Sequence, residues 1–274
     1  MRGSISSIDI HCHLDSLDYG EDLPLILARM EEKGVGAITI GTDLGSSKRA
    51  VKIAEENENI WACVGVHPSP ASGRGAEGEV LEQEFEKLVQ SPKVVGIGEC
   101  GLDFFRTKPE ELEKEKERQV ELFKQQIDFA LKYDKPLMLH CRNAYDEVLE
   151  ILSEYKGAEG PEAVKLRGNC HFFAGNVEQA AKFVELGFSC SFTGVITFTQ
   201  DYDEVIKSLP LECIMSETDA PFVAPVPYRG KRNEPTYVIE VVKKLAEIKG
   251  KTMEEMADIV MHNAQRLFSL TLLQ

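Results

Sequence analysis

Two histidines near the N-terminus, His11 and His13, have the spacing expected of paired metal ligands. They follow a short apolar run rich in β-branched residues, which predicts a β-strand at positions 4–10. Side chains two positions apart lie on the same face of a strand, so both imidazoles should point the same way and Cys12 the opposite way. Imidazole is a common transition-metal ligand. The pair therefore predicts part of a metal site, and the rest of the chain must supply further ligands.

The elements that would position these ligands alternate regularly along the chain. Apolar runs of strand length, each followed by a segment of helical periodicity, predict strands at 4–10, 36–40, 60–66, 94–100, 136–141, 166–171, 188–192 and 212–217. Thr252 and Glu255 form a capping box that begins one more helix. Eight repeats over about 250 residues predict a (β/α)8 TIM barrel with an extra C-terminal helix. An open doubly wound sheet is the alternative. We expect a single domain over residues 1–274.

Further candidate ligands fall at the carboxyl ends of the predicted strands. Glu99, His140 and His171 end the fourth, fifth and sixth strands, and Glu217 and Asp219 follow the eighth. Parallel barrel strands end at one mouth, so these side chains should converge. A mixture of imidazole and carboxylate favours zinc, manganese, iron or nickel over calcium or magnesium. Even without Glu217, the six remaining candidates exceed the three or four protein ligands of one open catalytic site, so we expect two ions, with Glu99 able to bridge them.

Composition limits the classes of partner and the compartment. A formal net charge of −15 weighs against a surface that binds nucleic acid by bulk electrostatics, although bound divalent ions and a few arginines can supply positive charge locally. Seven cysteines without a Cys-x-x-Cys pair argue against a disulfide framework. We expect a cytoplasmic protein with no signal peptide and no membrane span. The cysteines next to the candidate ligands should alternate away from them into the core, namely Cys12, Cys100, Cys141 and Cys170.

The motifs together resemble one known family. They are DIHCHL at 9–14, GVHP at 65–68, GECGLD at 98–103, HCR at 140–142, HFF at 171–173, GVITF at 194–198 and ETDAP at 217–221. In this combination and order the chain resembles the TatD family of metal-dependent deoxyribonucleases, within the amidohydrolase-like barrels, nearly from end to end. It departs from the family's usual residues at Phe172, Ala174 and Tyr228.

The resemblance implies a ligand set and a reaction. Two groups of ligands would share Glu99: His11, His13 and Asp219 at one ion, and His140 and His171 at the other. Asp219 and Glu99 would be the catalytic residues, Asp219 by orienting or deprotonating the attacking water and Glu99 by bridging the ions. The implied reaction is phosphodiester hydrolysis, typically 3′–5′ exonucleolytic shortening of DNA, with metal ions polarising the phosphoryl oxygen. Single-stranded DNA or DNA 3′ ends would be the substrate.

Other residues are candidates for substrate contacts. His67 is a candidate for contacting a phosphate or supporting a ligand, and Arg142 and Arg229 are candidate phosphate clamps, although either arginine could be an ordinary surface ion-pair partner. Glu217 could bind a metal or orient a ligand. Phe172 and Phe173 are interpreted as core rather than as a stacking surface for bases.

Two other functions remain open from the sequence. A hydrolase of the same barrel type could cleave another bond, for example the ester of a D-aminoacyl-tRNA, because water activated between two metals also attacks carbonyl carbon. A non-catalytic metal-binding module would predict a lost ligand, and every candidate ligand is present.

Overall fold

Eight parallel strands form the centre of the molecule. The computed structural model describes residues 5–69, 83–158 and 161–271. The strands are β1 (Ser7–Cys12), β2 (Val35–Ile40), β3 (Ile60–Val64), β4 (Val94–Asp103), β5 (Leu137–Arg142), β6 (Gly168–Cys170), β7 (Phe188–Phe192) and β8 (Ile214–Ser216). They pair in sequence order, each parallel to the next. The predicted TIM barrel is confirmed, and the open doubly wound alternative is wrong.

The barrel closes through the residues around β1 and those that follow β8. Cys12 and Ala220 form a parallel bridge. The backbone N–H of Asp219 donates to the carbonyl of His11 at 2.9 Å, and that of His13 donates to Ala220 at 2.7 Å. His11, His13 and Asp219 are themselves predicted ligands, and Cys12 and Ala220 adjoin them, so closure of the wall and placement of the ligands depend on the same backbone.

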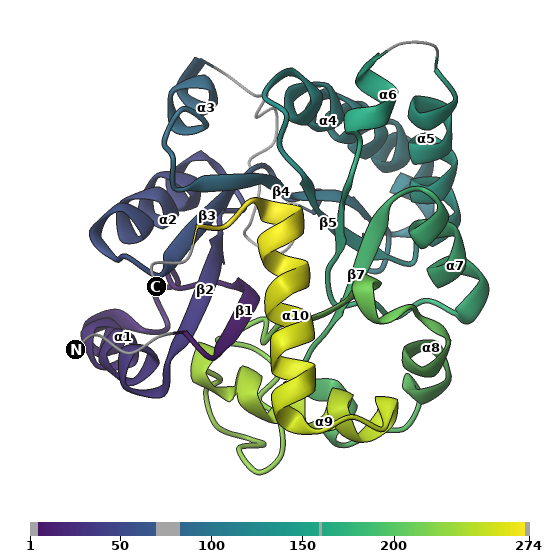
Figure 1. Cartoon of the computed structure of the whole chain (residues 1–274). Coiled ribbons are helices and arrows are strands. Elements are labelled where there is room, and N and C mark those ends of the chain that lie inside the picture. Colours follow the sequence, from purple (N-terminus) through teal and green to yellow (C-terminus); the bar gives the residue numbers. More distant parts are fainter. Residues whose placement is uncertain (1–4, 70–82, 159–160, 272–274) are drawn as a thin grey trace.

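Helices surround the strands (Figure 1). They are α1 (Leu23–Lys33), α2 (Leu44–Glu56), α3 (Gln83–Leu88), α4 (Leu112–Lys132), α5 (Tyr145–Gly157), α6 (Pro161–Lys165), α7 (Val177–Glu185), α8 (Asp203–Ser208), α9 (Val238–Lys249) and α10 (Met253–Phe268). Gly34 and Gly250 end α1 and α9 in the left-handed conformation that favours glycine. None of the helices in the described part of the chain combines the length and apolar character needed to cross a membrane.

The additional helix α10 packs against the end of the barrel opposite the ligands, where it crosses in front of the strands in Figure 1. Its capping box is present, because Thr252 accepts from the N–H of Glu255 at 3.1 Å and Glu255 accepts from that of Thr252 at 2.8 Å. Phe268 and Met261 of α10 join a buried cluster with inward residues such as Ile10. This cluster fills the lower barrel, while a larger one lies between the strands and the outer helices.

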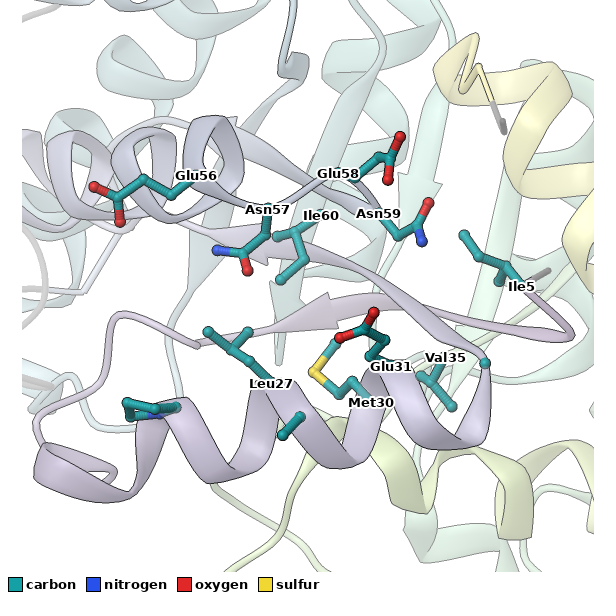
Figure 2. Close-up of a pocket in the computed structure, with 13 residues that line it drawn as sticks. Ile5, Leu27, Met30, Glu31, Val35, Glu56, Asn57, Glu58, Asn59 and Ile60 are labelled. Atoms are coloured by element: carbon teal, nitrogen blue, oxygen red, sulfur yellow. The ribbon is translucent and has the colours of Figure 1, made fainter. Parts of the chain in front are cut away.

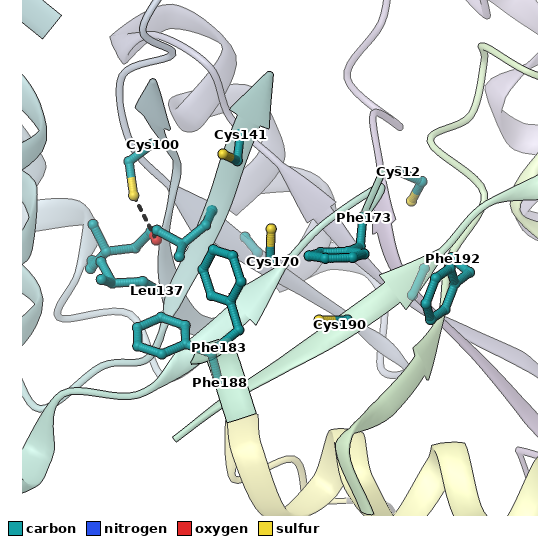
Figure 3. Packing of buried hydrophobic residues seen from close by; sticks show 14 of the residues in the cluster. Cys12, Cys100, Leu137, Cys141, Cys170, Phe173, Phe183, Phe188, Cys190 and Phe192 are labelled. Carbon is teal, nitrogen blue, oxygen red and sulfur yellow. Dashed lines mark hydrogen bonds between the residues drawn. The ribbon is translucent and has the colours of Figure 1, made fainter. Parts of the chain in front are cut away.

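The cysteines beside the candidate ligands belong to that outer cluster, as predicted. Cys12, Cys100, Cys141 and Cys170 are buried there. Figure 3 shows Cys170 and Cys190 among phenylalanines, and the thiol of Cys100 directed at a backbone carbonyl. Burial raises the pKa of Cys100 well above its usual value, and its thiol lies in the outer cluster, away from the candidate ligands.

Several boundaries differ from the prediction for local reasons. The first strand extends to Cys12 rather than ending at residue 10, because a register shift against β2 between Asp9 and Cys12 lets pairing continue past His11. The eighth begins only at Ile214, because a 3-10 turn at Leu211–Cys213 follows Pro210. The sequence also predicts a loop at 69–78 and a helix at 80–89. Residues 70–82 lie outside the described part of the chain, and the described part of this helix is α3.

Candidate metal centre

One group of donor atoms comes from β1 and the segments after β4 and β8. The Nε2 atom of His13 lies 3.4 Å from Oδ1 of Asp219 and 3.8 Å from Oε2 of Glu99. The Nε2 atom of His11 lies 3.9 Å and 3.7 Å from the same two oxygens. Both Nε2 atoms and Oε2 of Glu99 are buried without a hydrogen-bond partner among the described residues. Buried polar atoms are normally paired, so this convergence indicates a missing central partner.

A second group surrounds the other oxygen of the same carboxylate. Oε1 of Glu99 lies 2.8 Å from Nδ1 of His140 and 3.1 Å from Nε2 of His171. These two nitrogens are 3.2 Å apart. The Nε2 atom of His67 lies 3.4 Å from the same oxygen. Glu99 thus faces a different pair of predicted ligands with each of its oxygens.

The donor spacing fits metal coordination. Ligands at about 2.0–2.2 Å from a tetrahedral ion stand roughly 3.3–3.6 Å from one another. The first group spans 3.4 to 3.9 Å and the second 2.8 to 3.2 Å, so small side-chain adjustments would bring both into that range. His11, His13 and Glu99, and likewise Glu99, His140 and His171, form clusters that could hold an ion. The chemistry of the donors and their unpartnered atoms therefore fit divalent metal ions.

The carboxylates of the cluster are ionised. Burial alone would raise the pKa of Glu99, but the charges of His67 and His171 bring it well below its usual value. Burial would also raise the pKa of Asp219, and the neighbouring imidazoles of His13, His11 and His171 lower it. Two negative groups at the bottom of the mouth provide a strong attraction for cations.

The pKa values of the imidazoles are not all shifted in the same direction. Burial would lower the pKa of His171, but the carboxylates of Glu99 and Glu217 raise it well above its usual value. His140 is raised mainly by its hydrogen bond to Asp103, against the effect of burial. Burial, with the charge of His171, lowers the pKa of His11. Metal ligation requires the neutral imidazole, so protons compete with metal at His140 and His171.

Hydrogen bonds behind the ligands fix the ring orientations. Nδ1 of His13 lies 3.0 Å from the carbonyl of Ile40, and this donation leaves the Nε2 lone pair facing the cluster. Nε2 of His140 lies 3.1 Å from Oδ2 of Asp103. These contacts select one ring nitrogen of each histidine for the centre of the mouth.

Glu217 lies behind His171 rather than beside the first group. Its Oε1 is 3.3 Å from Nδ1 of His171 and accepts from the N–H of Phe172 at 3.0 Å. Its Oε2 accepts from the hydroxyl of Ser191. The carboxylate is fully buried. These partners suit a residue that orients a ligand, although His11, His171 and Glu217 also lie close enough to form a candidate ion-binding cluster.

A buried side-chain pair joins β1 to β8 beneath the first group. Oδ1 of Asp9 accepts from the N–H of Thr218 at 2.9 Å and from that of His11 at 3.2 Å. Oδ2 of Asp9 accepts from the hydroxyl of Thr218. The same hydroxyl oxygen accepts from the N–H of Ala220 at 3.1 Å. The Asp9–Thr218 pair therefore fixes the two segments that carry His11 and Asp219.

The predicted substrate residues divide into inner and outer positions. His67 is buried against Glu99 and accepts from the N–H of Ser69 at 3.0 Å. Arg142 and Arg229 are exposed at the end of β5 and in the loop after β8. Of the two phenylalanines predicted to be core, Phe173 is buried and Phe172 is only half-buried.

Sequence reasoning assigned no role to Asp9, Asp103 or Thr218. Each lies in one of the motifs of the sequence. The available signal for Asp9 was its position, two residues before His11 on the same predicted strand. Their partners come from other strands, so the contacts depend on strand register. A register shift between Ile97 and Cys100 in the β4–β5 pairing, for example, precedes the alignment of Asp103 with Arg142.

A separate cleft of about 480 Å³ lies between the ends of α1 and α2 and the start of β3 (Figure 2). Leu27, Met30 and Ile60 line it together with Glu31 and Glu58. These segments are at the amino ends of the strands, so the cleft is on the opposite side of the barrel from the ligands.

The fold and the site together define a TIM barrel whose carboxyl mouth carries His and carboxylate clusters that could hold divalent metal ions. The chain matches the family model described as TatD related DNase over residues 8–269. It is 38% identical over 266 residues to the uncharacterized metal-dependent hydrolase YabD of Bacillus subtilis strain 168, and this match covers 96% of this chain and 98% of the relative. It is 34% identical over 269 residues to the uncharacterized metal-dependent hydrolase YcfH of Escherichia coli K12, with 96% of each chain covered.

Solved structures agree with this family. The crystal structure of YjjV, a TatD homolog from Escherichia coli K12, superposes with a TM-score of 0.84 at 28% identity, covering 97% of this chain and 99% of that one. A TatD family hydrolase from Entamoeba histolytica shows the same fold, with a TM-score of 0.82 at 24% identity and coverage of 98% and 99%. The chain belongs to the TatD family and is a metal-dependent hydrolase.

Proposed function

We propose that this protein is a TatD-type deoxyribonuclease that removes nucleotides from the 3′ ends of single-stranded DNA with two divalent ions per subunit. The observation that supports it best is the position of Glu99. Its Oε2 faces the unpartnered Nε2 atoms of His11 and His13, and its Oε1 faces His140 and His171. A carboxylate between two such groups suits a pair of neighbouring ions, and paired ions are typical of phosphodiester-cleaving enzymes.

Each ligand has a place in this proposal. His11, His13 and Asp219 would hold one ion, His140 and His171 the other, and Glu99 would bridge them. Imidazole with carboxylate suits zinc, manganese, iron or nickel, and magnesium is the remaining candidate for a phosphodiesterase. When bound, the ions supply charge that stabilises the reacting phosphoryl group and lowers the pKa of water.

Asp219 is proposed as the residue that orients the attacking water and accepts its proton. Its pKa is lowered, so Oδ1 and Oδ2 are available as acceptors. Its side chain is 14% exposed, against 2% for Glu99, so water and substrate at the mouth can contact it. Glu99, in this proposal, positions the ions and takes no proton, because both its oxygens are directed at imidazoles.

The family's name for its model and the arginines at the mouth support DNA as the substrate. A phosphodiester brings negative charge to a protein of net charge −15, so local cations must offset the repulsion. His67, Arg142 and Arg229 are the proposed phosphate contacts, and Glu217 the residue that orients His171.

The test is a metal-dependent cleavage assay on single-stranded DNA labelled at the 5′ end. Purified protein is stripped with chelator and reloaded with each candidate ion, beside His140→Ala and His262→Ala. His262 is an exposed histidine of α10, on the opposite end of the barrel, and is the matched control. We expect a ladder that shortens from the 3′ end, is lost with chelator and with His140→Ala, and persists with His262→Ala.

A parallel reaction with D-aminoacyl-tRNA tests the alternative ester substrate. Intact DNA together with metal-dependent release of the amino acid would replace the nuclease assignment with deacylation. Cleavage of DNA that His140→Ala leaves unchanged would contradict the proposed second ion.

A further inference from the structure

We propose that two arginine–phenylalanine stacks at the barrel mouth bind an unpaired DNA strand and lead it to the metal centre. The stacks are Phe105 with Arg142, and Phe198 with Arg229; together they are called the strand clamp. This inference rests on the proposed nuclease function and adds to it the residues that recognise the unpaired strand.

The charge distribution is the first argument. In this acidic protein many arginines are neutralised by carboxylates: Arg29 by Glu234, Arg49 by Asp15, Arg118 by Glu115, Arg167 by Asp134 and Arg232 by Asp22. Within the described ranges, Arg142 and Arg229 have no carboxylate within ion-pair distance, and neither does Arg106 beside the first stack. All three are exposed and follow the carboxyl ends of strands. Arg266 of α10 also lacks a carboxylate partner among the described residues, but it lies at the other end of the barrel and donates to the backbone carbonyl of Glu212. Three of the four arginines without an ion pair in the described ranges are therefore collected at the mouth.

Stacking presents these guanidinium groups in a fixed orientation. The Cζ atom of Arg142 lies 3.7 Å from the ring centroid of Phe105, and that of Arg229 lies 3.6 Å from the centroid of Phe198. A guanidinium flat on a ring keeps its N–H edge free, and that edge matches two phosphate oxygens. The pairing also reduces the number of side-chain conformations to be lost on binding.

The rings themselves remain accessible. Phe105 is 51% exposed and Phe198 is 41% exposed, in a protein that buries most of its phenylalanines. An exposed ring beside a guanidinium offers a surface on which a base can stack, and such stacking does not depend on base identity. Phosphate contact and base contact would thus come from the same stack.

The first stack is connected directly to the second group of ligands. In the backbone register of β4 and β5, Arg142 is the strand partner of Asp103. The N–H of Phe105 donates to Oδ1 of Asp103 at 3.0 Å, and Oδ2 of Asp103 lies 3.1 Å from Nε2 of His140. One carboxylate therefore positions both the ring and a ligand.

The second stack lies on another side of the mouth. Phe198 follows the 3-10 turn Gly194–Thr197 after β7, and Arg229 lies in the loop that continues from β8 and Asp219. The N–H of Val226 donates to the hydroxyl of Thr197 at 2.9 Å and joins the two loops. In the order of the barrel, β6 separates the stacks on one side and β1–β3 on the other.

An unpaired strand fits both features at once. A duplex presents phosphates, but its base faces are covered by neighbouring base pairs, so exposed rings gain nothing from it. A single strand offers phosphates and base faces together. The occupant that matches two cationic stacks around a hydrolytic centre is therefore a single-stranded DNA segment.

The test measures binding of hydrolysis-resistant phosphorothioate oligomers to the metal-loaded protein by fluorescence anisotropy. The probes are a thymidine oligomer, an abasic oligomer with the same number of phosphates, and a duplex of the same length. The variants are Phe105→Ala with Phe198→Ala, and Arg142→Gln with Arg229→Gln. Arg167→Gln, which removes an arginine next to the amino end of β6, controls for the change in net charge.

We expect the native protein to bind the thymidine oligomer about tenfold more tightly than the abasic one. The phenylalanine variant should lose this preference and keep its salt dependence. The arginine variant should lose about 1.4 from the slope of log affinity against log salt, about 0.7 for each phosphate contact removed. Arg167→Gln should change neither, and the unfolding temperature of each variant verifies its fold.

Other results would overturn the strand clamp. Equal binding of the two oligomers by the native protein, duplex binding as tight as single-strand binding, or an unchanged salt slope in the arginine variant would each do so. Failure of the proposed function gives a different result: native protein would then cleave neither DNA nor bis(p-nitrophenyl) phosphate with any metal. DNA cleavage with unaltered binding by the variants would leave the nuclease intact and remove the clamp.

Discussion

Thr218→Val would test whether the Asp9–Thr218 pair stabilises the seam between β1 and β8. Valine has nearly the same shape as threonine but lacks the hydroxyl, which donates to Asp9 and accepts from the N–H of Ala220 at 3.1 Å. The backbone N–H of Thr218 still donates to Asp9 at 2.9 Å in the variant. The substitution therefore removes two buried hydrogen bonds and creates no cavity.

The size of the effect follows from these two bonds. A buried hydrogen bond to a carboxylate contributes about 1.5–3 kcal/mol, and a buried N–H left without a partner costs about 1 kcal/mol or more. The sum is roughly 3 kcal/mol, which lowers the unfolding temperature of a protein of this size by roughly 6–12 °C. Burial raises the pKa of Asp9 and the Thr218 hydroxyl lowers it, so the pKa rises further in the variant. The deficit should therefore be larger at about pH 8 than at about pH 5.

Urea unfolding of metal-free native protein, Thr218→Val and Thr218→Ser provides the measurement. Serine keeps the hydroxyl, so Thr218→Ser should restore most of the lost stability. Isothermal titration with metal should show weaker binding at the group that contains His11 and Asp219, because the seam carries both. A Thr218→Val protein within about 0.5 kcal/mol of the native one, with unaltered metal affinity, would refute the reasoning.

Further predictions concern the ligands and the core. Metal-free protein should be most stable between about pH 4.5 and pH 6.5. The raised pKa of His171 gives stability that is lost as the pH rises through the pKa of His171, and the lowered pKa of Glu99 gives stability that is lost as the pH falls through the pKa of Glu99. Thermal unfolding across pH checks this, and a maximum above about pH 8 would contradict it. Glu217→Gln should weaken metal affinity or activity by about 10–100-fold while the fold persists, because His171 loses its orienting carboxylate; an unchanged metal titration would exclude this role. Phe268→Ala should destabilise the protein by about 3–5 kcal/mol and leave the specific activity of folded enzyme unchanged; a selective loss of activity would show that the lower barrel affects the mouth.

The sequence predicted the architecture because the strands of a parallel barrel are buried on both faces and read as apolar runs. Helix ends such as those at Gly34 and Gly250 also carry a local signal, because a glycine that follows a helical segment favours the left-handed conformation. The sequence did not locate the ends of β1, because the shift in register between Asp9 and Cys12 depends on β2. Short 3-10 turns such as Leu211–Cys213 have no periodicity to detect.

The site was predictable where one residue type at one strand end carries the information. Histidines and carboxylates after successive strands indicated a common mouth, and the structure places Glu99, His140 and His171 together. The cation–π stacks were not predictable, because Phe105 and Phe198 meet their arginines only after the loops fold. Sequence alone assigned phosphate binding to the arginines and stacking to no residue.

The closure of the barrel has a consequence for the order in which a ribosome-bound chain can acquire its two ligand groups. Glu99, His140 and His171 lie on consecutive strands in the middle of the chain, so this group can assemble while the last third is still being synthesised. The other group needs the seam, whose Asp9 and Thr218 are 209 residues apart. Contacts of such long sequence separation form late because the intervening loop must be closed first. We therefore expect the growing chain to bring Glu99, His140 and His171 together before Asp219, the residue proposed to accept the proton, can reach His11 and His13.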